Sequence, residues 1–383
     1  MTPPPLLLAD MHLSGDHEGA WRLPSSPVER ITDPGYFAEL AETVSRGGFD
    51  AVFFPDFVGY DPLVRSVVRW PHEPTTLAAA LLQRVPDLGV IVTASTVFAT
   101  PDQLYRTFHT LGELSGGRIG WNIVTAGSPS VATAIGGDPV PPHDERYRKA
   151  GGIIDDLLRR WGSTRPVLAQ AGASPAGRDF AARYAEVVFT ATPSKSEAIA
   201  FRSDLRRRAI GFGRDPDEIR VLPGILTVLG ATDDDARALH DRLGALVTEH
   251  AARHMLGMYG VDLPAEGLDA RLDRVTSSPG HDGILSRAAV LDGIAAQLGQ
   301  ASTWRDLVNR IAGSRGHLSV TGSGQTVAAA MNDWLTDGAC DGFVVKFAHS
   351  PGGADDFVRT VSPLLTSRGI GSRAGWSGIR TTV

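Results

Sequence analysis

The sequence contains very little cysteine, since Cys340 is the only one among 383 residues. A single thiol cannot form an internal disulfide, and it excludes a zinc site built from several cysteines. Such low cysteine usage fits a reducing compartment. Cys340 lies in GACDGFVVKF, between an expected helix end and an expected strand, which favours a small buried residue over a nucleophile.

Long apolar runs and dense clusters of one charge are also missing. The N-terminal apolar run ends at Asp10 after four residues, with no basic segment before it, so we expect neither a signal peptide nor a transmembrane span. The formal net charge is −6, and the most basic stretch, RSDLRRRAIGFGR, is diluted by Asp204. This distribution does not fit a nucleic-acid-binding protein. We expect a soluble, cytoplasmic protein with no nucleic-acid or membrane partner.

What the sequence does contain is a regular alternation of short apolar runs with helical patterns. Eight runs are expected to form strands, at residues 5–10, 50–56, 88–95, 118–126, 165–172, 185–192, 219–230 and 340–348. Nearly all are continuous, which is typical of parallel strands covered on both faces by helices. The sequence therefore predicts an α/β fold, a (β/α)8 TIM barrel. An open doubly wound sheet usually carries a GxGxxG after its first strand, and none is present.

The alternation breaks between about residues 232 and 325, where the sequence is largely helical with a polar piece at 272–283. We predict one barrel domain spanning 1–383 with a helical insertion after the seventh strand. A long insertion of this kind is usually a lid or a pocket wall, and 272–283 is the candidate lid. The tail, 369–383, has little periodicity and is expected to cover the surface.

Barrel enzymes place their sites at the C-terminal ends of the strands. The polar residues expected there are Asp10, His12, Asp56, Thr93, Ser95, Asn122, Thr125, Gln170, Ser174, Lys346 and His349. His12 lacks the His-x-His partner of metal-dependent barrel hydrolases, so we expect no metal site. Lys346 is expected to be solvated or ion-paired rather than to form a Schiff base.

Two polar segments at expected helix starts are further candidates for the site. In QAGASPAG, Ser174 is suited to cap a helix and Pro175 to begin it, so the helix start could hold a phosphate or be an ordinary capped terminus. In PPHDERY, the side chains of His143, Arg146 and Tyr147 would share one face of a helical first turn, which is otherwise a solvated helix start.

Four longer segments carry a resemblance to a known family. They read VTASTVFATPDQLYRTFHTLGELSGGRIGWNIVTA, HDERYRKA, RPVLAQAGASPAGRDFAARYAEVVFTA and GSGQTVAAAMNDWLTDGACDGF. Through them the chain resembles the flavin-dependent monooxygenases of the bacterial luciferase superfamily, in the nitrilotriacetate and dibenzothiophene-sulfone monooxygenase branch. The resemblance covers nearly the whole chain and implies a (β/α)8 barrel with an insertion.

The resemblance implies a two-component, FMNH2-dependent monooxygenase. A separate NAD(P)H:flavin reductase would supply reduced FMN, and the enzyme would insert one oxygen atom from molecular oxygen into a small organic substrate through a flavin hydroperoxide. It also implies a homodimer or homotetramer. Two alternatives stay open: a deazaflavin-dependent oxidoreductase of the same superfamily, and a catalytically degraded flavin-binding homologue. The latter is prompted by the short segment between Tyr147 and Pro166, which leaves the roof of the active site more open.

The same resemblance assigns site residues. It implies that FMN is bound by Asp56, Thr93, Asn122, His143, Tyr147, Gly172, Ala173 and Ser174, and that His143 and Asn122 are catalytic. Asn122 interrupts the apolar strand of GWNIV, where a buried amide without partners would cost about 1–3 kcal/mol. The polar edge of the flavin would explain why an amide is tolerated there.

Overall fold

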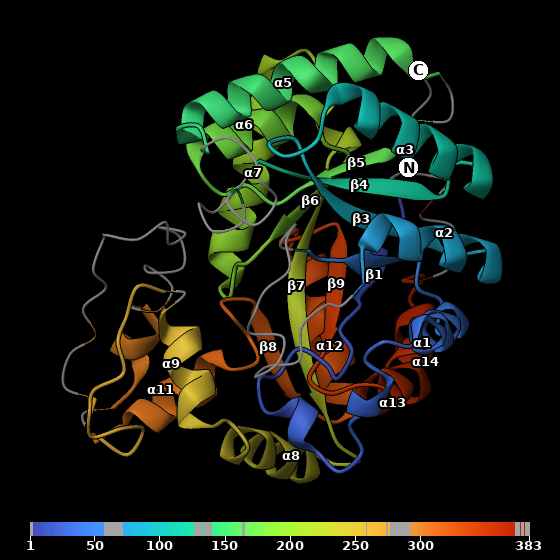
Figure 1. Ribbon diagram of the computed structural model, residues 1–383. Coiled ribbons are helices and arrows are strands. Elements are labelled where there is room, and N and C mark those ends of the chain that lie inside the picture. The colour runs from blue at the N-terminus through green and yellow to red at the C-terminus, as the bar shows by residue number, and fades with distance from the viewer. Residues whose placement is uncertain are drawn as a thin grey trace.

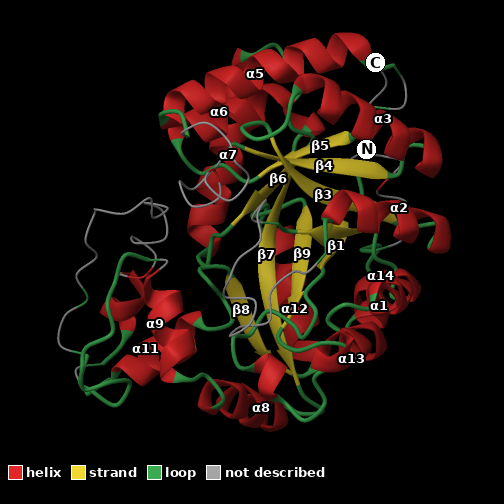
Figure 2. Cartoon of the chain, viewed as in Figure 1, coloured by secondary structure: helices red, strands yellow, loops and turns green. Residues whose placement is uncertain are grey.

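The chain forms a ring of strands enclosed by helices, as Figures 1 and 2 show. The computed structural model describes residues 3–56, 72–125, 132, 140–162, 165–257, 259–272, 275, 291, 293–299, 301–371, 376 and 379. Most of the candidate lid at 272–283 lies outside these residues, so its role stays a prediction. No helix within the described ranges is long and apolar enough to cross a bilayer.

Eight parallel strands close the barrel, which confirms the predicted (β/α)8 TIM fold. They are β1 (Leu6–Asp10), β2 (Ala51–Phe54), β3 (Gly89–Ser95), β4 (Ile119–Val124), β5 (Val167–Gln170), β6 (Val187–Thr190), β7 (Arg220–Leu229) and β9 (Gly342–Phe347). Strands β1 to β6 pair in chain order, and β9 pairs with both β1 and β7. Pairing of β6 with β7 completes the ring.

Helices surround the ring, and their boundaries follow local signals. They are α1 (Pro34–Arg46), α2 (Pro74–Arg84), α3 (Pro101–Ser115), α5 (His143–Arg160), α6 (Pro175–Tyr184), α7 (Lys195–Gly211), α8 (Asp233–Ala245), α12 (Gly324–Thr336), α13 (Gly352–Thr360) and α14 (Ser362–Thr366). Three short 3-10 helices are η1 (Ala20–Arg22), η2 (Val28–Arg30) and η4 (Pro216–Glu218). Helix α3 illustrates the signals: Thr100 and Gln103 form a capping box, and Gly116 ends the helix in the left-handed region.

The barrel strands bury both faces, which is why their apolar runs are continuous. On β1, Leu6 and Leu8 pack into the barrel interior, while Leu7 and Ala9 pack toward the helices. Asp10 is the next inward-facing residue of β1, so the barrel interior becomes polar at its C-terminal end. Strand β4 shows the same change, because Trp121 and Ile123 face the helices and Asn122 faces inward.

The N-terminal end of the barrel is closed by the C-terminal tail. Trp376 and Ile379 are buried among the inward-facing residues. A Cβ atom on Gly89 would lie 2.5 Å from the Trp376 ring, so the indole sits directly against the start of β3. The prediction that the tail covers the surface is wrong for these two residues. Small residues such as Gly89 leave space at this end of the barrel, and the two apolar side chains fill it.

A ninth strand, β8 (Leu318–Gly322), was not predicted and lies within the segment assigned to the helical insertion. It pairs in parallel with the second half of the ten-residue β7, whose first half pairs with β6. β8 ends the sheet order, so its other edge pairs with no described strand.

Between β7 and β8 the chain forms a small helical unit with its own apolar cluster. Helices α9 (Glu249–Gly257) and α11 (Trp304–Ile311) pack through Met255, Leu307 and Ile311, all fully buried. In Figure 1 they lie beside the barrel next to β8. These helices fit the predicted insertion, while the boundaries of the insertion and the assignment of 1–383 to one domain stay predictions.

Candidate functional site

A chain of hydrogen bonds crosses three strands at the C-terminal end of the barrel. The Thr93 hydroxyl on β3 donates to the carbonyl oxygen of Phe54 on β2, at 2.9 Å. Its oxygen accepts a hydrogen bond from the Asn122 amide nitrogen on β4, at 3.0 Å. Because the Thr93 hydroxyl donates its hydrogen to the Phe54 carbonyl, the Asn122 group facing it must be the NH2 donor. The carbonyl oxygen of the Asn122 side chain therefore faces away from Thr93.

That oxygen, Asn122 Oδ1, is buried and accepts no hydrogen bond from any described residue. Asn122 is only 6% exposed, so water does not solvate it freely. A buried acceptor left unpaired costs about 1–3 kcal/mol, which a ligand N–H at this position would recover. An isoalloxazine ring presents such a donor at its polar edge, so the Asn122 amide fits a flavin.

A second polar group lies where α5 and α6 begin. Ser174 caps α6, its hydroxyl accepting from the Gly177 amide at 3.1 Å, and Pro175 is the first helical residue. Both features were predicted. The His143 imidazole, at the start of α5, brings Nε2 within 3.4 Å of the Ser174 hydroxyl. The two helix starts therefore converge, and each has its positive dipole end there.

Tyr147 completes this group, one turn further along α5. Its ring centroid lies 5.1 Å from that of His143 and 5.7 Å from that of Phe180 on α6. Its hydroxyl lies so close to Gly177 that a Cβ atom there would come within 2.9 Å. Glycine at position 177 is thus required by the approach of α5 to α6, and the face that His143 and Tyr147 were predicted to share exists.

The turn between β5 and α6 is equally tight. The Gln170 side chain accepts from the Gly172 amide at 2.6 Å, which folds the turn back on the end of β5. A Cβ atom on Gly172 would lie 2.8 Å from the Gly177 Cα, so no larger residue fits. The Ala173 carbonyl accepts from the Arg178 guanidinium at 2.9 Å. Small residues and a helix start in this arrangement can hold a phosphate.

The structure thus brings the predicted residues together in two groups, Thr93 with Asn122, and His143, Tyr147, Gly172, Ala173 and Ser174. Asp56 lies two residues beyond β2 and is partly exposed. It lies two residues after Phe54, whose carbonyl ends the hydrogen-bond chain.

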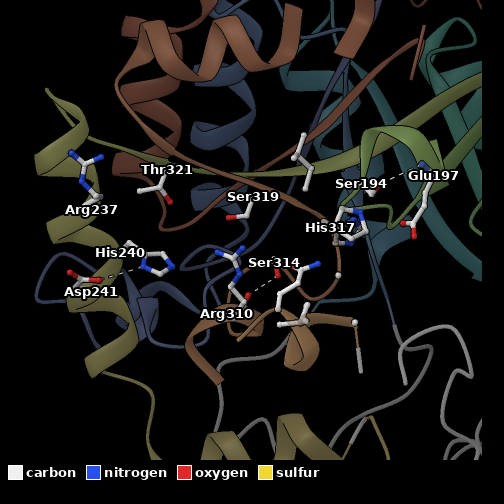
Figure 3. Close-up of a pocket in the computed structure, with 16 residues that line it drawn as sticks. Ser194, Glu197, Arg237, His240, Asp241, Arg310, Ser314, His317, Ser319 and Thr321 are labelled. Carbon is white, nitrogen blue, oxygen red and sulfur yellow. Dashed lines mark hydrogen bonds and ion pairs between the residues drawn. The ribbon is translucent and has the colours of Figure 1, made fainter. Parts of the chain in front are cut away.

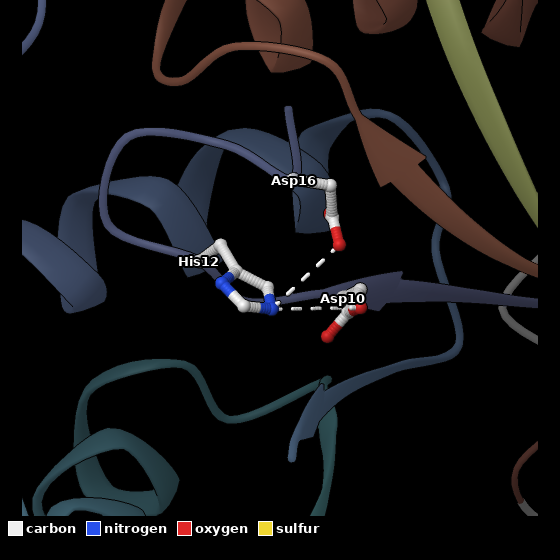
Figure 4. Close-up of side chains that lie close together, drawn as sticks. All are labelled: Asp10, His12 and Asp16. Carbon is white, nitrogen blue, oxygen red and sulfur yellow. Dashed lines mark ion pairs between the residues drawn. The ribbon is translucent and has the colours of Figure 1, made fainter. Parts of the chain in front are cut away.

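A cluster of buried charges lies at the C-terminal ends of β1 and β9. The Lys346 ammonium forms ion pairs with Asp10 and with Asp16, the latter at 2.8 Å. The His12 Nε2 atom points at both carboxylates, 3.6 Å from Asp16 and 4.0 Å from Asp10 (Figure 4). Lys346 is therefore buried and ion-paired, in agreement with the prediction of a solvated or ion-paired lysine.

The charges of this cluster are balanced within the protein. Burial raises the pKa of Asp10 despite the opposing effect of Lys346. Burial acts to raise the pKa of Asp16 too, but Lys346 and His12 outweigh it and the pKa is lowered. Burial acts to lower the pKa of Lys346, and the two carboxylates outweigh it and raise it. The two carboxylates thus keep Lys346 charged, and the cluster stabilises the charged form of Asp16 more than that of Asp10.

Asp10, His12 and Asp16 could in principle offer three ligand atoms to a metal, since these atoms lie within 4.8 Å of one another. The Lys346 ammonium already bonds to both carboxylates, so the lysine supplies the cation that this group of acids needs. That the protein binds no metal stays a prediction. Asp16 was not predicted, because an acid six residues after Asp10 in SGDHEGAW reaches the cluster only through the way in which the loop folds back.

The loop after β1 is fastened to the end of β9. The amides of Asp16 and His17 donate to the carbonyls of Phe347 and Ala348, at 2.8 and 3.2 Å. The Glu18 carboxylate forms an ion pair with Arg315, which follows α11. These contacts link the barrel mouth to the inserted helices. Cys340, by contrast, is buried just before β9, as predicted for a small buried residue, and burial raises its pKa to about 12.

Comparison with known proteins adds a family to this geometry. The profile of a family described as "Luciferase-like monooxygenase" matches residues 12–321. The N-acetyl-S-(2-succino)cysteine monooxygenase of Bacillus subtilis (strain 168) is 31% identical to this chain, over 93% of this chain and 91% of that protein. Nitrilotriacetate monooxygenase component A of Aminobacter aminovorans is 30% identical, over 94% and 91%.

The solved structures agree with the sequence relatives. The EDTA monooxygenase from Chelativorans sp. BNC1 superposes with a TM-score of 0.78 at 27% sequence identity. The match covers 97% of this chain and 96% of that chain, so the two proteins share a fold over nearly their full lengths.

Proposed function

Because the chain belongs to the luciferase-like monooxygenase family, we propose that it is a two-component monooxygenase that uses reduced FMN to insert one oxygen atom from molecular oxygen into a small organic substrate. A separate NAD(P)H:flavin reductase supplies the reduced FMN. The protein acts in the cytoplasm as a homodimer or homotetramer. Reduced FMN, when bound, supplies the two electrons that activate oxygen.

The observation that carries the proposal is the buried Asn122 Oδ1 atom, which accepts no hydrogen bond from the described residues at the end of an otherwise satisfied hydrogen-bond chain. Asn122 accepts from the polar edge of the flavin and fixes the ring against the C-terminal ends of β3 and β4. Thr93 fixes the amide so that its oxygen, not its nitrogen, faces the ring. Asp56, at the end of β2, borders the same edge.

The flavin phosphate lies at the converging starts of α5 and α6. Ser174 and the turn formed by Gly172 and Ala173 contact it, with His143 and Tyr147 beside it. The 3.4 Å separation between His143 Nε2 and the Ser174 hydroxyl favours contact with the phosphate for His143, whereas Asn122 touches the ring. Of the two residues proposed as catalytic, Asn122 is therefore the one nearer the reacting atoms.

Anaerobic titration with reduced FMN tests the proposal. We expect quenching of protein fluorescence with saturation at micromolar FMN, and slower oxidation of the bound flavin than of free reduced FMN when oxygen is admitted without substrate. A deazaflavin-dependent oxidoreductase would ignore FMN, and a catalytically degraded homologue would bind it without protecting it from rapid oxidation. Either result would reject the monooxygenase.

Replacing Ser174 by aspartate is expected to weaken reduced-FMN binding by about tenfold or more, because a carboxylate would face the phosphate. Aspartate is also a good helix cap, so α6 should keep its start and the protein its stability. Titration of reduced FMN against both proteins measures the change. The matched control is Ser323→Asp, since Ser323 caps α12 in the same way. Equal losses in the two variants would remove Ser174 from the phosphate site.

Replacing Asn122 by leucine is expected to lower FMN affinity by roughly 10- to 100-fold, the equivalent of one buried hydrogen bond and its orientation. Folding stability should fall less, since Leu removes an unpaired acceptor together with a donor. Thr93→Val tests the orientation: it leaves the amide in place but frees it to rotate, so a smaller loss is expected. Unchanged affinity in Asn122→Leu would place the flavin elsewhere.

A further inference from the structure

A cavity of about 720 Å³ lies beside β8, and the side chains of Glu197, Arg237 and Arg310 line it (Figure 3). All three residues are exposed, so water screens their charges and none of them requires a ligand. A smaller cavity, of about 140 Å³, lies at the N-terminal rim of the barrel and differs in this respect. Among the residues that line it is Arg220, which is only 4% exposed.

The smaller cavity is lined by three arginines and two aspartates, so these side chains together carry a formal charge of +1. They are Arg202, Arg206, Arg220, Asp217 and Asp341. Arg202 and Arg206 lie on α7, Arg220 is the first residue of β7, and Asp341 directly precedes β9. The predicted flavin residues lie at the C-terminal ends of the strands, so the cavity is at the opposite end of the ring.

The Arg220 guanidinium is buried without an ion pair to any described carboxylate. Its Nη2 atom donates to the backbone carbonyls of Pro4 and Asp341, the latter at 3.1 Å. Burial lowers the pKa of Arg220, the carboxylates of Asp341 and Asp50 oppose this effect, and the two arginines of α7 add to it. A buried charge without a charged partner is costly in free energy, and an anion in the cavity would remove part of that cost.

The two aspartates of the cavity are already paired with the arginines of α7. Arg202 lies 2.6 Å from Asp341, and Arg206 lies 3.1 Å from Asp217 and 3.3 Å from Asp341. The Asp341 carboxylate also accepts from the Val221 amide, at 2.9 Å. The Nε atom of Arg206 is buried and donates to no described residue. The wall of the cavity therefore has more positive charge and more N–H donors than its own acids satisfy.

We propose that this cavity binds a small tetrahedral oxyanion of the sulfate or phosphate type, held by Arg220 and Arg206. A guanidinium suits such an ion because its planar set of N–H donors matches two oxygens at once. The cavity volume equals that of roughly four or five water molecules, which fits a free oxyanion. Sites for drug-sized ligands measure about 300–1,000 Å³, so a nucleotide does not fit. The bound ion would join α7 to β7 and to the N-terminal segment at Pro4.

Calorimetric titration with sodium sulfate and, separately, sodium phosphate tests the proposal, in Tris chloride buffer at constant ionic strength. The titrations use the Ser174→Asp variant, in which a carboxylate opposes any anion in the proposed flavin-phosphate turn. We expect one ion per chain, with a Kd of about 1 mM or below. Arg206→Gln in this background should weaken binding by about tenfold or more, because it removes one of the two guanidiniums. Arg220→Lys keeps the charge but loses the planar set of donors, so a loss of about threefold or more is expected.

The matched control is Arg214→Gln. Arg214 follows α7 and is partly buried like Arg206, but it pairs with Glu218 and does not line the cavity. Binding should be unchanged in this variant, and sulfate should raise the unfolding temperature of the control but not that of Arg206→Gln. If neither ion binds at millimolar concentration, or if Arg206→Gln and Arg214→Gln weaken binding equally, the cavity is not an oxyanion site. None of these results depends on whether the protein binds reduced FMN.

Discussion

Replacing Lys346 by methionine is expected to lower the free energy of unfolding by about 3–5 kcal/mol, the usual cost of removing one partner from a buried ion pair. Methionine fills most of the volume but leaves Asp10 and Asp16, each 1% exposed, facing one another without the ammonium. The pKa of Asp16 should then rise, since Lys346 is the main group that lowers it. Urea unfolding at neutral pH measures the loss.

The matched control is Lys195→Met. Lys195 also bridges two aspartates, Asp333 and Asp337, but at the protein surface, where water screens the charges. Its loss should be much smaller. The double variant Lys346→Met with Asp10→Asn should regain part of the stability, because one of the two facing acids is then neutral. If Lys346→Met and Lys195→Met lose equal stability, the buried cluster is not what holds the loop after β1 to β9.

The barrel could be predicted because its strands are buried on both faces. The run at 88–95 became β3 (Gly89–Ser95) almost to the residue, since every position in it packs against helices or the interior. β8 could not be predicted in the same way. Only Leu318 and Val320 are apolar in it, and most of the strand is only partly buried. Trp376 was missed because a single aromatic in a tail without periodicity gives no sign that it plugs a barrel.

The residues at the C-terminal end of the barrel could likewise be predicted only in part. Asn122 and Ser174 could be proposed as site residues because each breaks a local pattern, an amide within an apolar strand and a cap before a proline. Asp16 gives no such sign. Its partner Lys346 is at the other end of the chain, and the two meet only because β1 and β9 are neighbours in the closed ring.

Acid is expected to destabilise the protein through His17, which lies in the loop after β1. The imidazole is 3% exposed, and its Nδ1 atom accepts from the Gly19 amide at 3.1 Å. A nitrogen that accepts carries no proton, so the ring is neutral with its hydrogen on Nε2. Burial lowers the pKa of His17 to about 3, with His240 and Arg315 acting in the same direction and Glu18 opposing them.

The direction of the change in stability with pH follows from the pKa of His17 in the folded and unfolded protein. The unfolded chain protonates this imidazole near its ordinary pKa of 6.5, whereas the native protein resists until about pH 3. Between these values the unfolded state binds the extra proton, so stability falls as the pH falls, by about 1.4 kcal/mol per pH unit. Over the whole window the loss from His17 is on the order of 4–5 kcal/mol.

Urea unfolding of the native protein and of His17→Gln at several pH values between 7 and 4 measures this slope. The variant should be less stable at neutral pH, because it loses the packing of a buried ring. The pH slope of its free energy of unfolding should nevertheless be smaller, by the contribution of about one proton. Some slope should remain, since burial also lowers the pKa of His12 and His349. His250→Gln, at an exposed position of α9, controls for the loss of a histidine. Parallel slopes in the native protein and His17→Gln would show that acid acts elsewhere. A shallower slope in His17→Gln would identify the contact between the loop after β1 and the inserted helices as acid-sensitive. In that contact His17 faces His240 on α8, and the next residue, Glu18, is paired with Arg315.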